Sequence, residues 1–175
     1  MNQIKTFELF GEYNQLMNQR LYAASSKLPD EKLKENRGAF FKSLFGTLNH
    51  IFVGDIIWLK RFSRVPSKQQ VLSALNNYQT PVSLNSLIYT EFEELKKERQ
   101  VLDKLIVEWV NTLTEESLNY NLSYTNMKEV SFTKNYSSLI NHLFLHQIHH
   151  RGQATTLLSQ FGIDFGETDL IEIIK

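Results

Sequence analysis

The 175-residue chain contains no cysteine, only three prolines and seven glycines, and no long hydrophobic run. The lack of cysteine excludes disulfides, thiolate metal sites and a cysteine nucleophile. The scarcity of proline and glycine predicts long regular elements with few breaks. No stretch approaches the roughly 18 apolar residues of a membrane span, and the N-terminal sequence lacks the apolar core of a signal peptide. We therefore expect a soluble, cytoplasmic protein without a membrane segment.

The chain also lacks an excess of charge of either sign, since 19 basic side chains are matched by 19 acidic ones. Proteins that bind nucleic acid or an anionic membrane usually carry a basic face. The even balance therefore predicts neither nucleic acid nor a membrane surface as a partner. A chain of this length can bury a core without disulfides or metal, and we expect a single domain over residues 1–175.

The hydrophobic pattern predicts an all-α fold, a four-helix bundle with a small β-hairpin before the last helix. Apolar residues recur with a helical period in four segments. In the third segment, only Arg99 interrupts the apolar positions. The hairpin is predicted from two alternating stretches within residues 118–134. The segment Ser67–Asn85 is polar and irregular. The predicted helices are Gln3–Lys27, Gly38–Phe62, Ile88–Leu113 and Tyr136–Phe161.

The stretch HLFLHQIHHRGQ, which begins at His142, contains four of the five histidines of the chain. At 100° per residue, His146 and His150 lie within about 20° of Leu139 on the apolar stripe of the last helix, and His142 and His149 lie on its flank. One inward histidine is compatible with a hydrogen-bonded core residue. Two of them, one turn apart, can direct ring nitrogens at one cation, as in helical zinc motifs.

A mononuclear site needs a third ligand, and the remaining histidine is His50, on the second predicted helix. Its position on the helical wheel permits it to face the last helix but does not require it. Asp55 falls in the apolar stripe of the same helix. It is a candidate catalytic base, a fourth ligand, or a group that orients a ligand. The alternative interpretation is that Asp55 pairs with a buried arginine or tyrosine.

Three segments together resemble the DinB family of bacterial four-helix-bundle proteins: LNHIFVGDIIWLKRF, HQIHHRGQ and FGIDFGETDLI. The similarity extends nearly from end to end of the chain. It implies a divalent metal, commonly zinc or nickel, held by His50, His146 and His150. It also implies that Arg151, Gly152 and Gln153 support this site or its packing.

The resemblance favours a metal-dependent transferase that adds a low-molecular-weight thiol, such as bacillithiol, mycothiol or glutathione, to an electrophilic small molecule. A metal-dependent hydrolase with Asp55 as its base is the second hypothesis. A non-catalytic metal-binding protein, acting in the stress response or in protein interactions, is the third. The resemblance and the two apolar sides of the second helix also predict a homodimer. Alternatively, the segment Ser67–Asn85 covers that second side within one chain.

Overall fold

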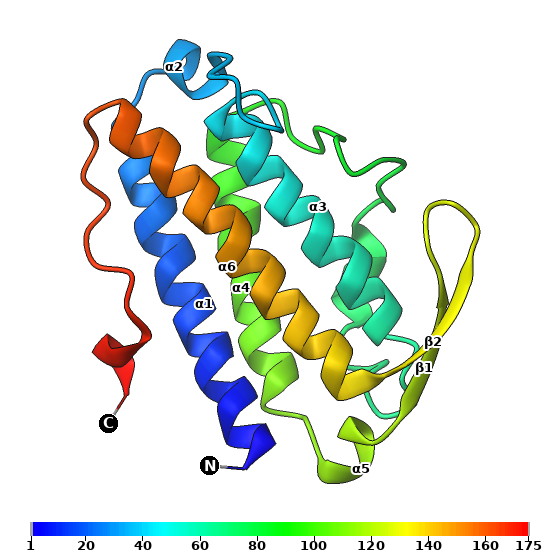
Figure 1. Cartoon of the computed structure of the whole chain (residues 1–175). Coiled ribbons are helices and arrows are strands. Elements are labelled where there is room, and N and C mark those ends of the chain that lie inside the picture. The colour runs from blue at the N-terminus through cyan, green and yellow to red at the C-terminus, as the bar shows by residue number, and fades with distance from the viewer. Residues whose placement is uncertain (1, 175) are drawn as a thin grey trace.

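The computed structural model describes residues 2–174. Four long helices form the bundle: α1 (Gln3–Ser25), α3 (Leu44–Phe62), α4 (Phe92–Val110) and α6 (Tyr136–Gln160) (Figure 1). Shorter helical segments lie between and after them: α2 (Asp30–Lys34), η1 (Ser73–Asn77), α5 (Glu115–Leu118) and η2 (Leu170–Ile173). Strands β1 (Asn121–Thr125) and β2 (Ser131–Asn135) pair antiparallel directly before α6. The predicted all-α bundle with a hairpin before its last helix is confirmed.

The helices pack as two adjoining pairs. Helix α1 packs mainly against α4, and α3 packs mainly against α6. Contacts between α1 and α6 join the two pairs. In Figure 1, α6 therefore runs beside both α1 and α3. No helix in the described part of the chain is long and apolar enough to cross a membrane. The arrangement places the histidines of α6 against α3, which carries the fifth histidine.

Helix α3 begins at Leu44, so the prediction that it starts near Gly38 was wrong. The backbone of Gly38 and Lys42 has φ values of 74° and 68°, in the left-handed region that no α-helix can contain. Ser43 then caps the helix, because its side chain accepts a hydrogen bond from the N–H of Gly46. As a result, Phe41 lies in a turn in front of α3 and not within it.

Every residue of α3 is buried or half-buried, on both apolar sides of the helix. The segment after α3 supplies much of this cover, since its Leu72 and Leu75 are buried and its Tyr78 ring packs edge-on against Phe52. Residues 67–85 thus cover part of α3 within the chain. These contacts do not test the homodimer.

The hairpin leads directly into α6 and places its tip near α3. Asn126 shapes the tip, because its side-chain oxygen accepts hydrogen bonds from the backbone N–H groups of Lys128 and Val130. Asn135, the last residue of β2, caps α6 by accepting from the N–H of Ser138. The hairpin and α6 therefore form one continuous unit that fixes the tip beside the histidine face.

Candidate metal centre

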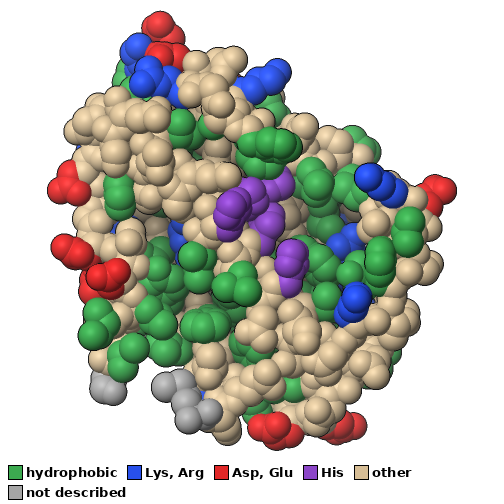
Figure 2. Space-filling model, in the orientation of Figure 1, with side chains coloured by type: hydrophobic (Ala, Val, Ile, Leu, Met, Phe, Trp, Pro, Cys, Tyr) green, Lys and Arg blue, Asp and Glu red, His purple; other side chains and the backbone are tan. Residues whose placement is uncertain are grey.

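Three histidines converge between α3 and α6. The Nε2 atom of His50 lies 3.1 Å from Nε2 of His146 and 3.1 Å from Nε2 of His150. One ligand atom of each residue lies within 4.8 Å of the other two. Figure 2 shows the histidines gathered on one face of the molecule, among hydrophobic side chains. The cluster can hold a metal ion, with two ligands one turn apart on α6 and the third from α3.

Hydrogen bonds fix which ring nitrogen carries the proton in two of the three histidines. Nδ1 of His50 lies 2.9 Å from the carbonyl oxygen of Leu84. A carbonyl oxygen only accepts, so Nδ1 of His50 is the protonated nitrogen. Nδ1 of His150 lies 2.8 Å from Oε1 of Gln153, whose amide nitrogen is 3.2 Å from Nε2 of His149. This orientation makes Gln153 the acceptor and His150 the donor.

The Nε2 atoms of His50 and His150 therefore present lone pairs to each other at 3.1 Å, with no proton between them. This contact is unfavourable unless a cation sits among the rings. Neutral imidazoles whose second nitrogen donates to a carbonyl or amide oxygen are the usual ligands of zinc and nickel. The residues present fit a divalent transition metal.

His146 is positioned by a close approach of the two helices. A Cβ atom built on Gly54 would lie 2.6 Å from Cε1 of His146, closer than non-bonded carbons can approach. The ring therefore packs directly on the α3 backbone, and only glycine leaves room for it. Nδ1 of His146 is buried and has no hydrogen-bond partner among the described residues.

The three rings are uncharged at neutral pH. Burial lowers the pKa of His50 to about 4, although its hydrogen bond to Leu84 opposes the shift. Burial and repulsion from the neighbouring imidazoles lower the pKa of His146 to about 3. Burial also lowers the pKa of His150, although its hydrogen bond to Gln153 opposes the shift. Metal ligands must be deprotonated at the donor nitrogen, and this environment supplies that state without proton loss.

A cavity of about 630 Å³ opens in front of the histidines, a volume typical of small-molecule sites. The ring of Phe41 stacks on His50 at a centroid distance of 3.7 Å and forms part of one wall. Among the described residues, no aspartate or glutamate lines this cavity. The lining residues are Phe40, Phe41, His50, Gly54, Ile57, Trp58, Arg61, Leu84, Asn126, Met127, Lys128, His142, His146, His149, His150 and Gln153.

The two other histidines of α6 lie in the cavity wall outside the cluster. His142 is exposed and packs edge-on against Trp58, with ring centroids 5.0 Å apart. His149 is exposed and contacts Gln153 through the hydrogen bond described above. For His142, the partial burial of the ring and the charge of Arg61 both lower the pKa. Neither side chain shares the meeting point of the three Nε2 atoms.

Asp55 is fully buried and lies outside the cavity and the histidine cluster. Its Oδ2 atom accepts hydrogen bonds from Arg99 and Gln147. Arg99 also lies 2.9 Å from Asp103. Burial raises the pKa of Asp55, whereas the guanidinium of Arg99 opposes that shift by stabilising the carboxylate. The structure thus gives Asp55 the buried arginine partner that was the alternative interpretation from the sequence.

The ion pairs belong to a polar layer that connects all four long helices. Arg151 of α6 donates to Asn14 of α1, and Asn18 of α1 donates to Asp103 of α4 at 2.8 Å. Gln147 lies in this layer on α6, directly after His146. Because a buried polar group without a partner is costly, the layer fixes the rotation of α6 and with it the direction of the histidines.

The sequence matches the DinB family over residues 1–174. It is 27% identical over 165 residues to a Bacillus subtilis (strain 168) relative named protein DinB, an alignment that covers 93% of this chain and 90% of the relative. No solved structure matches the chain at a significant level. The helical bundle, the histidine cluster and the match along nearly the whole sequence lead to one conclusion: the chain belongs to the DinB family.

Proposed function

We propose that the protein is a metal-dependent enzyme that transfers a low-molecular-weight thiol to an electrophilic small molecule. His50, His146 and His150 would hold a divalent zinc or nickel ion. The observation that carries this proposal is the meeting of their Nε2 atoms at the wall of an open cavity of about 630 Å³. A purely structural metal site is usually closed by four protein ligands, whereas a catalytic one keeps a position open.

The chain supplies binding and orientation for this chemistry. A metal bound by three neutral imidazoles keeps its full charge and would lower the pKa of a thiol beside it. Because the protein has no cysteine, the sulfur must arrive with a second substrate. The thiol proton leaves to solvent, and the sulfur forms a bond to the electrophilic carbon as the leaving group departs with its electron pair. Phe41 and Trp58 offer apolar surface to the carbon skeleton.

The hydrolase hypothesis has less support from the site. Hydrolysis needs a general base within hydrogen-bond reach of the attacking water. The described cavity lining contains no carboxylate, and Asp55, the base named in this hypothesis, is engaged by Arg99 and Gln147 away from the cavity. A hydrolase would instead need His142 or His149 as its base. A purely metal-binding role needs no open cavity beside the histidines, so the transferase is the function the site supports best.

Elemental analysis of tag-free protein tests the metal site first. We expect near-stoichiometric zinc or nickel in the parent protein and its loss in His50→Ala, His146→Ala and His150→Ala. His142→Ala and His149→Ala are matched controls, because each removes an imidazole from the same cavity but outside the cluster; both should retain the metal. If the parent protein takes up neither zinc nor nickel from an excess of the ion, the proposed metal site is refuted.

Thiol consumption then tests the reaction. Glutathione or bacillithiol is incubated with 1-chloro-2,4-dinitrobenzene, and thioether formation is compared between metal-loaded protein and the His146→Ala variant. We expect formation above background only in the loaded protein. A loaded protein that binds metal but forms no thioether with any low-molecular-weight thiol would contradict the transferase and leave the non-catalytic metal-binding role.

A further inference from the structure

Arg61 carries a positive charge that faces the cavity and has no carboxylate partner among residues 2–174. It lies near the end of α3, on the same face as His50, Gly54 and Trp58, all of which line the cavity. Its guanidinium carbon is 4.6 Å from the centroid of the Trp58 ring and 4.8 Å from that of Tyr124. Its one hydrogen bond among the described residues goes to the backbone oxygen of Thr125, at 3.2 Å.

The surroundings leave this charge uncompensated. Lys128, from the hairpin tip, lines the same cavity, and no acidic side chain of the described residues does. Burial of the guanidinium lowers the pKa of Arg61; Tyr124 opposes this shift, and the neighbouring charge of Arg64 adds to it. A half-buried guanidinium packed against two adjoining aromatic rings keeps its planar donor edge in place at little entropic cost. Such an edge matches a carboxylate, which can accept two of its N–H groups at once.

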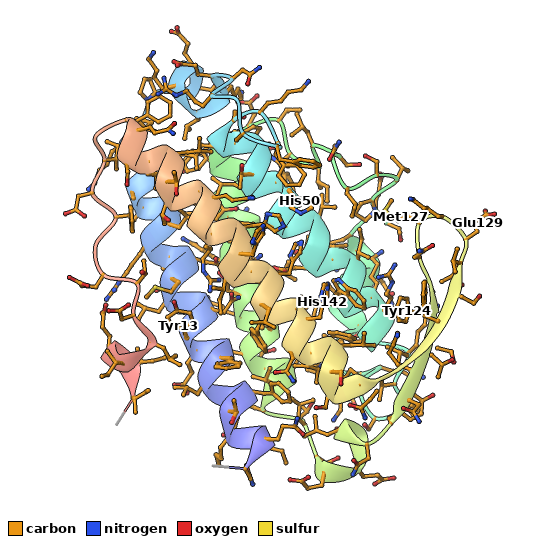
Figure 3. All side chains as sticks on the ribbon, in the orientation of Figure 1. Tyr13, His50, Tyr124, Met127, Glu129 and His142 are labelled. Carbon is orange, nitrogen blue, oxygen red and sulfur yellow. The ribbon has the colours of Figure 1, made fainter. Side chains whose placement is uncertain are left out.

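The charge and the histidine cluster lie at different ends of the cavity. Arg61 follows His50 by about three helical turns, which separates their Cα atoms by about 16 Å along the helix. The guanidinium reaches back over Trp58, one turn nearer to the cluster. Figure 3 shows His50 on α3, and His142 on α6 and Tyr124 on the hairpin lie farther toward the hairpin end of the molecule. A ligand that contacts both ends must be elongated.

We propose that this end of the cavity is an anion subsite, in which Arg61, assisted by Lys128, binds the carboxylate of an elongated organic acid. The apolar part of that acid packs on Trp58, and its other end points toward the histidines. The inference goes beyond the proposed function, because it specifies the ligand class and does not depend on a metal. The other role open to Arg61 is structural, since its contacts with Tyr124 and Thr125 also tie the hairpin to α3.

The two roles separate in a comparison of two ligands of equal length, 4-phenylbutyrate and 4-phenyl-1-butanol. Binding is followed by NMR through the indole N–H of Trp58, with Trp109, which is fully buried, as the internal reference. We expect the parent protein to bind the carboxylate at least about tenfold more tightly than the alcohol, the effect of a charge-assisted hydrogen-bond pair. In Arg61→Gln, the two ligands should bind with affinities within about twofold of each other.

Two further variants control for charge and folding. Arg64→Gln removes the same charge from an exposed side chain outside the cavity and should keep the carboxylate preference. Arg61→Lys retains the charge and should keep part of that preference even if Arg61→Gln folds poorly. Equal affinities in the parent protein would overturn the proposal. An equal loss of affinity for both ligands in Arg61→Gln would also overturn it, because that is the result expected of a purely structural residue.

A variant of the histidine cluster separates this inference from the proposed function. In His50→Ala, which removes one proposed metal ligand, the preference for 4-phenylbutyrate should persist because Arg61 is unchanged. If the preference disappears in His50→Ala and survives in Arg61→Gln, the carboxylate is held at the histidines and the anion subsite is refuted. If thioether formation fails while the Arg61-dependent preference holds, only the transferase is refuted.

Discussion

Replacing Gly54 with alanine should disrupt the metal site while leaving the bundle folded. The new Cβ atom would lie 2.6 Å from Cε1 and 3.2 Å from Nδ1 of His146. Non-bonded carbons settle at about 3.5–4.0 Å, so the ring must move by roughly 1 Å. Metal–ligand distances tolerate only about 0.2 Å, and His146 would no longer share an ion with the other two histidines.

The expected magnitudes differ for binding and for stability. Perturbing the orientation of a ligand costs about 10–100-fold in metal affinity, and displacing the ligand itself costs at least as much. Overpacking destabilises by about 1–3 kcal/mol. Alanine in a helix recovers about 1 kcal/mol relative to glycine. The net loss in the free energy of unfolding should therefore be at most about 2 kcal/mol, which the bundle can tolerate.

The measurement is a competition titration of zinc between the protein and a chromogenic chelator, together with urea denaturation of each metal-free variant. Gly152→Ala is the matched control, because this glycine lies in α6 and a Cβ atom there would meet nothing within 4 Å. It should gain up to about 1 kcal/mol in stability and leave zinc affinity unchanged. The reasoning is refuted if Gly54→Ala binds zinc as tightly as the parent protein.

Three further predictions concern the surroundings of the site and the state of the chain. Gln153→Leu removes the acceptor for Nδ1 of His150 and should weaken zinc binding by about tenfold or more in the same titration; unchanged affinity would show that the hydrogen bond does not orient the ring. Arg99→Leu leaves the Asp55 carboxylate buried without its cation and should lower the free energy of unfolding in urea by about 3–5 kcal/mol. A loss below about 1 kcal/mol would mean that Asp55 is protonated in the fold. The homodimer stays a prediction: light scattering should give twice the 20.5 kDa chain mass, and the monomer mass would contradict it.

Local sequence signals located most of the elements because helices and hairpins are set by short-range periodicity. The last helix was predicted as Tyr136–Phe161 and ends at Gln160. The start of α3 was placed too early, since the apolar run from Ala39 continues the helical pattern across a left-handed turn. Ser43, which caps α3, was the available signal. Arg99 also had a local signal, as the one charged residue in the heptad stripe of α4.

The sequence by itself determined that His146 and His150 share one face of α6, because residues four apart on any helix do so. The helical wheel left the direction of His50 open, and the family resemblance implied that it is the third ligand. Only the tertiary structure places its ring beside the other two. Two contacts could not be predicted from the sequence: the hydrogen bond of His50 to the Leu84 carbonyl, and the packing of the His146 ring on Gly54. A carbonyl partner is independent of side-chain type, and a close helix approach depends on how two distant segments pack. Helical periodicity is local in the chain, whereas a metal site depends on distances between helices.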